Sequence, residues 1–100
     1  MKLREIAHSR AGDKGNDSCI SVIVYDPADF DFLRDRLSAD VVKAHFAGIV
    51  LGEVERYEVP SIGALNFVLR QALGGGVTRS LRLDRHGKTL SGVMLEIELT

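Results

Sequence analysis

The sequence is poor in features that would tie the protein to a metal, a disulfide or a membrane. Cysteine occurs once, at Cys19, which excludes an internal disulfide and a site built from several thiolates. No segment approaches the run of roughly 20 apolar residues that spans a bilayer, and residues 1–10 lack the apolar stretch of a signal peptide. The histidines His8, His45 and His86 are scattered without a carboxylate cluster beside them, so no zinc site is indicated. We therefore expect a cytoplasmic protein without a metal or cofactor.

An excess of one charge is also absent. Thirteen basic and fourteen acidic residues leave a formal net charge of -1, so there is no overall basic field, and we expect neither nucleic acid nor a membrane as a partner. Linkers, low-complexity tracts and internal repeats are lacking too. With 100 residues, 45% of them hydrophobic, the chain has the size and composition of one domain with its own core. We predict a single domain over residues 1–100.

The first half of the chain predicts two strands and two helices. Residues 2–7 are expected to form a short strand, residues 8–17 an exposed loop, and residues 18–25 a central strand covered on both faces, with Cys19 buried. Asp26 followed by Pro27 is typical of a helix start. The apolar residues that follow at helical spacing are Phe30, Leu33 and Leu37.

A second helix is predicted to begin at Ser38, which can cap it, and to end near Gly48. Its inner face is expected to carry Val42, His45, Phe46 and Ile49. The stretch EVERYEV, residues 53–59, indicates a third strand at an edge of the sheet, because its charges are dense.

The remainder of the chain predicts a helix followed by a hairpin. Ser61 is expected to open a helix that ends at residues 74–76, with apolar residues at helical spacing at Ile62, Leu65, Leu69 and Ala72. Two alternating arms, residues 77–83 and 93–99, are expected to form a hairpin around the turn RHGK. The predicted fold class is α+β: a mainly antiparallel four- to five-stranded sheet with helices packed on one face.

The stretch HSRAGDKGND, residues 8–17, is the first candidate site. Gly12 and Gly15 permit backbone angles at which successive N–H groups form an anion-binding concavity, and Arg10 and Lys14 would add positive charge to it. The spacing is not that of a phosphate-binding P-loop, and a strand follows where that motif needs a helix. The alternative is an ordinary turn in which the glycines supply positive φ and the Asp and Asn side chains bond to nearby amides.

A second glycine-rich stretch, GGGVTRS at residues 74–80, permits a ligand to approach the backbone closely. By alternation Arg79 shares the apolar face of Val77 and Leu81, and an arginine there needs a partner. Asp13 is one candidate partner and a bound anion is another. The alternative for the glycine run itself is an ordinary helix end and turn.

A catalytic interpretation rests on fewer residues. His8, Ser9 and Asp13 are the residue types of a hydrolytic triad, but neighbours along a strand point to opposite faces, so His8 cannot readily serve Ser9. His8 and Asp13 therefore remain only as candidates for a general acid or base.

Four stretches of the sequence, HSRAGDKGNDSCISVIVYDP, VKAHFAG, VERYEVPSIGALNFVL and GGGVTRSLRLDRHGKTL, resemble in family order the small C-terminal domain of acyclic terpene utilisation protein A-like proteins. This domain is also encoded as a separate short polypeptide. The resemblance implies a ferredoxin-like fold, although the elements predicted above do not follow the simple β-α-β-β-α-β order. It also implies a link to bacterial degradation of isoprenoid and related acids as coenzyme A thioesters, in which the larger partner domain occurs. No catalytic assignment for the small domain comes with it.

Three function hypotheses follow. The favoured one is a noncatalytic accessory or assembly module that docks on a separately encoded large protein in acyl-CoA catabolism and contributes an anion- or CoA-binding surface. The residues nominated for that surface are Arg10, Gly12, Lys14, Gly15 and Arg79. The alternatives are a small independent enzyme acting on an acyl-CoA and a homo-oligomeric structural protein without a ligand. We also expect the isolated chain to be a homo-oligomer, a dimer, because the terminal strand VMLEIELT, residues 93–100, offers backbone groups to another chain.

Overall fold

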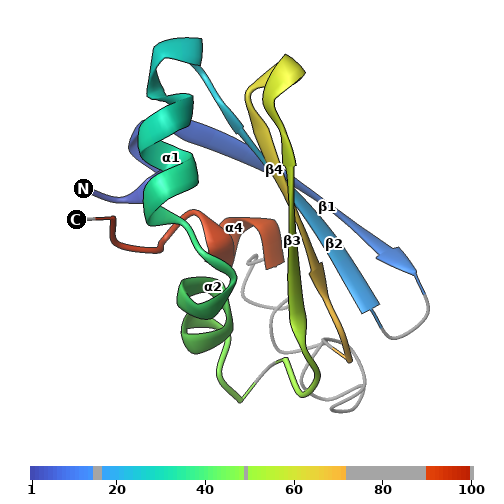
Figure 1. Ribbon diagram of the computed structural model, residues 1–100. Coiled ribbons are helices and arrows are strands. Elements are labelled where there is room, and N and C mark those ends of the chain that lie inside the picture. Colours follow the sequence, from blue (N-terminus) through green and yellow to red (C-terminus); the bar gives the residue numbers. More distant parts are fainter. Residues whose placement is uncertain (15–16, 49, 72–89, 100) are drawn as a thin grey trace.

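The described part of the chain is built on a four-stranded antiparallel sheet (Figure 1). The computed structural model describes residues 1–14, 17–48, 50–71 and 90–99. The strands are β1 (Ala7–Lys14), β2 (Asp17–Val24), β3 (Val54–Val59) and β4 (Ala64–Leu69). They lie in the order β1, β2, β4, β3, so β2 and β4 are internal while β1 and β3 are edges. This confirms the α+β class, the central strand at residues 18–25 and the edge strand at residues 53–59.

Helices cover one face of this sheet. Figure 1 shows α1, α2 and α4 on the same side of the strands, as predicted. Their bounds are Phe30–Arg36 for α1, Ala39–His45 for α2 and Leu90–Met94 for α4. Short 3-10 helices also occur at Leu3–Glu5 (η1), Pro27–Asp29 (η2) and Pro60–Ile62 (η3).

The starts of η2, which leads into α1, and of α2 follow directly from local sequence. The Asp26 carboxylate accepts a hydrogen bond from the Ala28 N–H at 3.0 Å, and η2 continues into α1. The Ser38 hydroxyl accepts one from the Val41 N–H at 3.2 Å at the start of α2. Both predicted caps are confirmed, since each side chain pairs a backbone donor that the helix itself leaves free.

The core lies between the sheet and the helices. Because successive side chains of a strand point to opposite faces, Ile20, Val22 and Val24 of β2 all face the helices and are buried. The largest buried side chains packed with them are Leu33, Leu37, Phe46, Leu65, Phe67 and Met94. The predicted helical stripe that begins at Phe30 is confirmed.

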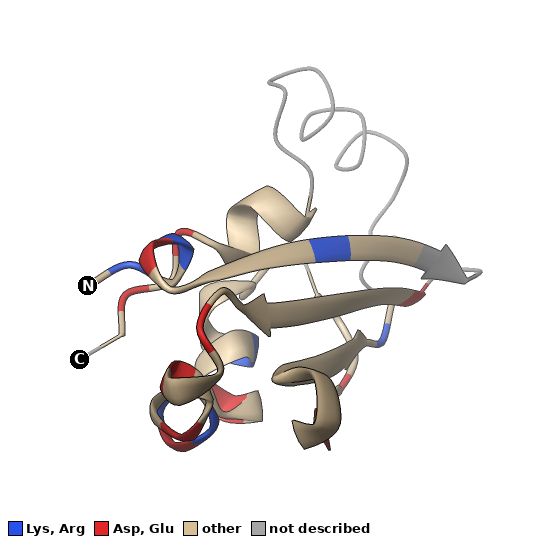
Figure 2. Ribbon diagram, turned by 90° about the horizontal axis from the view of Figure 1, so that it is seen from above, with Lys and Arg blue, Asp and Glu red and all other residues tan. Residues whose placement is uncertain are grey.

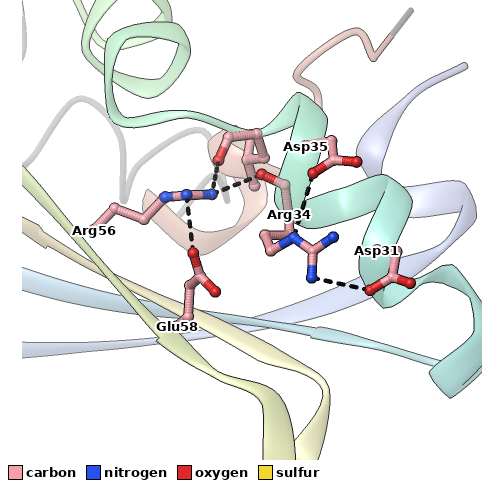
Figure 3. A network of polar contacts seen from close by, with 6 residues as sticks. Asp31, Arg34, Asp35, Arg56 and Glu58 are labelled. Carbon is pink, nitrogen blue, oxygen red and sulfur yellow. Dashed lines mark hydrogen bonds and ion pairs between the residues drawn. The ribbon is translucent and has the colours of Figure 1, made fainter.

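A polar network joins β3 to the end of α1 (Figure 3). Arg56 Nη1 donates hydrogen bonds to the carbonyl oxygens of Arg34, at 2.8 Å, and Leu37, at 3.2 Å. Its Nη2 lies 3.3 Å from Glu58 Oε2, and the Arg56 side chain is only 23% exposed. Because the last carbonyls of a helix lack partners within it, Arg56 fixes the end of α1 against the sheet.

The strand connections explain how the observed order of elements departs from β-α-β-β-α-β. β2 and β3 are joined through α1 and α2 and are both antiparallel to β4, which lies between them; this is a split β-α-β unit. In the simple β-α-β-β-α-β order, the strand on the outer side of the first strand is the last one along the chain. Here that place belongs to β1, which comes before β2.

We call the side of the sheet opposite the helices the open face; no described helix packs on it (Figure 1). The strand register places these positions on it: His8, Arg10, Gly12, Lys14, Asp17, Cys19, Ser21, Ile23, Glu55, Tyr57, Val59, Ala64, Asn66 and Val68. Cys19 is free and exposed, so the prediction that it is buried was wrong. The prediction that residues 18–25 are covered on both faces was wrong for the same reason: the described helices all lie on one side.

The N-terminal prediction was wrong in two respects. Residues 3–5 form η1 instead of a strand, and strand pairing begins at Ala7. Residues 8–14, expected as loop, belong to β1, whose pairing with β2 runs through to Lys14 opposite Asp17. The polar residues and Gly12 suggested a turn, but a long antiparallel partner supplies the backbone hydrogen bonds that hold them extended.

The helix expected from Ser61 was also wrong, because residues 64–69 form β4. The leucines Leu65 and Leu69 fit a helical period, but with Phe67 they equally fit alternation, and pairing with strands on both sides decides the outcome. Gly63, in the left-handed region at φ 64°, closes the tight connection through η3 that brings β4 back beside β3.

The expected C-terminal hairpin was wrong in its second arm, because residues 90–94 form α4; its first arm, residues 77–83, lies outside the described residues. Residues 97–99 instead pair with the N-terminal segment: the Leu3 N–H donates to the Ile97 carbonyl, and the Leu99 N–H to the Met1 carbonyl. The terminal segment is therefore not the free edge strand that was expected to pair with another chain.

The inner face of α2 was predicted correctly except at His45. Val42 and Phe46 are buried, and Gly48 lies at the end with φ 85°, whereas Ile49 is outside the described residues. His45 is exposed, and its Nε2 lies 2.8 Å from the Val93 carbonyl oxygen of α4. Residues three or four apart on a helix lie on nearly the same face but not in one line. His45 lies beside the buried stripe of Val42 and Phe46 and therefore reaches solvent.

Candidate functional site

The nominated anion-binding residues are placed along one side of β1. The positions of Arg10, Gly12 and Lys14 alternate onto the open face of this strand, so Gly12 lies between the two basic positions. Gly15 and Arg79 lie outside the described residues. The strand therefore brings two of the three nominated basic positions onto one face, although on an extended strand and not within a compact loop.

Arg10 is exposed and forms no ion pair with a described residue. Its row across the sheet consists of Ser21, Asn66 and Tyr57, none of which is charged at neutral pH. Ser21 Oγ donates to Asn66 Oδ1 at 2.7 Å, which satisfies both side chains within the row. In Figure 2 the middle of the sheet is accordingly mostly tan, apart from a blue band in β1. Arg10 thus presents a positive charge at one edge of the open face that no described residue compensates.

The two candidate acid–base residues are not brought together by β1. His8 alternates onto the open face, where its ring stacks on Tyr25 with centroids 5.3 Å apart. Asp13 occupies a position of the opposite face. Ser9 also points away from His8, and its Oγ donates to the Ser91 carbonyl of α4 at 2.8 Å.

A charged cluster that the sequence did not predict lies at the far end of the open face. Arg70, which follows β4, donates through Nη1 to Asp17 Oδ2 at 2.8 Å and through Nε to Glu55 Oε2 at 2.9 Å. The Gln71 N–H donates to Asp17 Oδ1 at 2.9 Å, and the Tyr57 hydroxyl donates to Glu55 Oε1 at 2.7 Å. This cluster joins the ends of three strands, and it brings two carboxylates to a single guanidinium.

These hydrogen bonds shift the ionisation of the cluster. The Gln71 N–H and then the Arg70 guanidinium hold the pKa of Asp17 below its usual value. The Arg70 guanidinium and then the Tyr57 hydroxyl do the same to the pKa of Glu55, while the bond to Glu55 raises the pKa of Tyr57. Both carboxylates therefore stay charged at neutral pH, and the cluster carries one net negative charge.

Gly52 makes the position of Arg70 feasible. Its N–H donates to the Arg70 carbonyl at 2.9 Å, and a Cβ on residue 52 would lie 2.7 Å from the Arg70 Cβ. Any larger residue would displace the guanidinium that holds the cluster together. The charges of EVERYEV were a usable signal for Glu55, but its partners are distant in sequence and could not be paired with it from spacing alone.

The described residues contain no group of three or more His, Cys, Asp or Glu side chains that could hold a metal ion. They also contain no helix long and apolar enough to cross a membrane.

Comparison with known proteins gives one family. The model of the AtuA ferredoxin-like domain matches residues 1–100. No curated protein and no solved structure matches the chain.

Proposed function

The chain belongs to the AtuA ferredoxin-like domain family, and from that premise we propose that it is a noncatalytic accessory module that docks on a separately encoded large protein in acyl-CoA catabolism. The family shows the ferredoxin-like fold that the sequence resemblance implied. The partner and the metabolic setting extend that resemblance, in which the large domain occurs in the degradation of isoprenoid and related acids as coenzyme A thioesters.

The observation that carries the proposal is the outer edge of β1. Within the described residues this strand pairs on one side only, with β2, and Arg10, Ala11 and Gly12 are all exposed. Proteins commonly blunt an edge strand with charges. β3 carries three of them, Glu55, Arg56 and Glu58, in six residues, whereas β1 carries three in eight, two of which are at its end, so that residues 7–12 contain only Arg10. β1 is therefore the edge better suited to accept a strand from another protein.

We predict that Ala11→Lys weakens binding to the large protein by about tenfold or more, which corresponds to about 1.4 kcal/mol. Ala11 is exposed in the middle of the edge, so a lysine is accommodated in the free chain but opposes an added strand. Calorimetric titration of the large protein with each variant measures the effect. Ala44→Lys, the same change at an exposed position of α2, should bind as the unmodified chain does. Equal affinities for both variants, or no complex at all, would contradict the proposal.

The same module is proposed to contribute an anion-binding surface along β1, centred on Gly12 between Arg10 and Lys14. Four residues of strand separate the two basic positions by roughly 13 Å, a spacing that suits contacts with separate phosphate groups of coenzyme A. What supports this is the charge of Arg10, which lies on an otherwise neutral row and has no ion-pair partner among the described residues.

For this surface we expect Lys14→Ala to weaken coenzyme A binding roughly 10- to 100-fold, the usual effect of losing a charge-assisted hydrogen bond. Equilibrium dialysis with coenzyme A measures it, and Lys43→Ala on α2 is the control, because Lys43 is paired with Glu53. Equal binding of coenzyme A by Lys14→Ala and Lys43→Ala would contradict the proposed surface. Turnover of an acyl-CoA by the purified chain would instead support the small-enzyme alternative, with His8 or Asp13 as acid or base.

A further inference from the structure

We propose that the open face binds the open face of a second copy of this chain, sheet against sheet, about a two-fold axis parallel to the strands. This goes beyond the docking function above, which uses the outer edge of β1, and it shares only Arg10 with the proposed anion-binding surface. We infer a second copy as the partner because the charges and apolar groups of the face are distributed so that the face is complementary to itself.

The open face changes in character along the strands. At one end lie Ile23, Val59 and the stacked pair of His8 and Tyr25. At the other end lies the net negative cluster of Asp17, Arg70 and Glu55. The face is therefore apolar at one end and charged at the other, so only some ways of turning a second copy onto it bring like groups together.

The row between these ends is also asymmetric. It begins with Arg10 on β1 and finishes with Tyr57 on β3. Tyr57 is 52% exposed, a large fraction for an aromatic side chain on a sheet, and its hydroxyl is bonded to Glu55. One edge thus offers a cation, and the other offers an aromatic ring backed by a carboxylate.

A two-fold axis parallel to the strands satisfies both asymmetries. It places each row over the same row of the second copy, with β1 over β3, and two sheets in such aligned packing lie about 10 Å apart. The apolar ends then meet, and Arg10 lies over Tyr57 of the second copy with Glu55 beside it. The charged ends also meet, but with β2 over β4, so that Asp17 of each copy lies over the strand end that carries Arg70 of the other. A cation over an aromatic ring and near a carboxylate is attracted by both.

The other two-fold arrangement of face on face, with the axis across the strands, fails on both counts. It places β1 over β1, so that Arg10 faces Arg10, and it brings the apolar end of one copy over the charged end of the other. Like charges opposed across an interface are unfavourable. Charge complementarity therefore selects the first axis, which gives an isologous dimer with two identical Arg10–Tyr57 contacts.

The area available fits a weak dimer. Four strands about 4.8 Å apart and six residues about 3.3 Å apart give a footprint of roughly 400 Å². Projecting side chains such as Tyr57 and Tyr25, which is 65% exposed, increase the accessible area toward the roughly 600 Å² per partner at the low end of specific interfaces. We expect a dimer that dissociates at micromolar concentrations.

Charge exchange across the contact tests the geometry. Arg10→Glu puts a carboxylate over Tyr57 and Glu55 of the second copy, and Tyr57→Arg puts a cation over Arg10. Each single variant should weaken dimerisation at least tenfold in sedimentation equilibrium. The double variant Arg10→Glu, Tyr57→Arg should recover dimerisation, because in both contacts the carboxylate at position 10 then faces the guanidinium at position 57. A mixture of the two single variants should form heterodimers, with one exchanged contact and one native contact.

Two controls separate the interface from the fold. Arg36→Glu makes the same charge change on α1, on the helix side of the sheet, and should dimerise as the unmodified chain does. Circular dichroism checks that each variant is folded. In the unmodified chain a short bismaleimide should crosslink two copies through Cys19, the only cysteine, because neighbouring strands about 4.8 Å apart on sheets about 10 Å apart place these thiols within reach.

The outcomes distinguish this inference from the docking function, since the large protein takes no part in them. A monomeric unmodified chain that is not crosslinked overturns the inference. Single variants that dimerise normally overturn the choice of face, and failure of the mixture to form heterodimers overturns the axis. Formation of a dimer by every variant except the two single exchanges supports it, whatever the result with the large protein.

Discussion

Replacing Phe67 by alanine is expected to lower the free energy of unfolding by about 3 to 5 kcal/mol. Phe67 lies in the internal strand β4 and is completely buried, on the face that packs against the helices. Truncation removes its apolar contacts and leaves a cavity that strands paired on both sides cannot close. Because a domain of this size is stable by about 5 to 15 kcal/mol, the variant should be close to unfolding. Urea denaturation followed by circular dichroism measures the change.

Val41→Ala is the matched control for this prediction. Val41 is 37% exposed on α2, so its truncation should change the stability by no more than about 0.5 kcal/mol. A loss of less than about 1 kcal/mol for Phe67→Ala, similar to that of the control, would mean that β4 does not pass through the centre of the core.

Arg56→Ala should cost about 2 to 3 kcal/mol of stability, because two backbone carbonyls at the end of α1 lose a charged donor. The largely buried guanidinium of Arg56 binds the Arg34 and Leu37 carbonyls and joins them to β3. Truncation leaves these carbonyls without that donor and detaches the end of the helix from the sheet. Thermal unfolding followed by circular dichroism measures the loss.

Two further variants separate the carbonyl contacts from the ion pair. Arg56→Lys keeps the charge but lacks the planar fork that reaches both carbonyls, so most of the loss should remain. Glu58→Gln removes an ion pair whose acid is 43% exposed, and such pairs contribute about 1 kcal/mol or less. A loss in Glu58→Gln equal to that in Arg56→Ala would assign the stabilisation to the ion pair.

The parts of the fold that the sequence predicted are those fixed within a few residues. Asp26 and Ser38 cap helices by bonding to amides two and three residues ahead, so their role can be inferred without knowledge of the partner segments. The alternation in β2 has the same local character. It identified the strand, but it could not show that only one of its faces would be covered.

The failures occurred where a distant segment decides the conformation. Leu65 and Leu69 fit a helix as well as a strand, and it is pairing with β2 and β3 that makes the segment extended. The candidate site shows the same limit. Arg10 and Lys14 were nominated from local charge and glycine, but their placement on a strand edge depends on the register with β2. The Arg70 cluster joins Asp17 and Glu55 from separate strands, and no local pattern links them.

The two ends of the described chain lie side by side (Figure 1), where the Met1 amino group donates to the Leu99 carbonyl at 3.1 Å and the backbones of Lys2 and Glu98 pair in an isolated antiparallel β-bridge. Joining these ends and opening the chain between Lys14 and Asp17 would give a circular permutant that begins with β2 and finishes with β1. Its strands would then follow the chain in the simple β-α-β-β-α-β manner without any change in the sheet. The permutant and the natural chain would thus differ in the order of strands along the sequence, while the packing of the sheet that forms the open face would be the same in both.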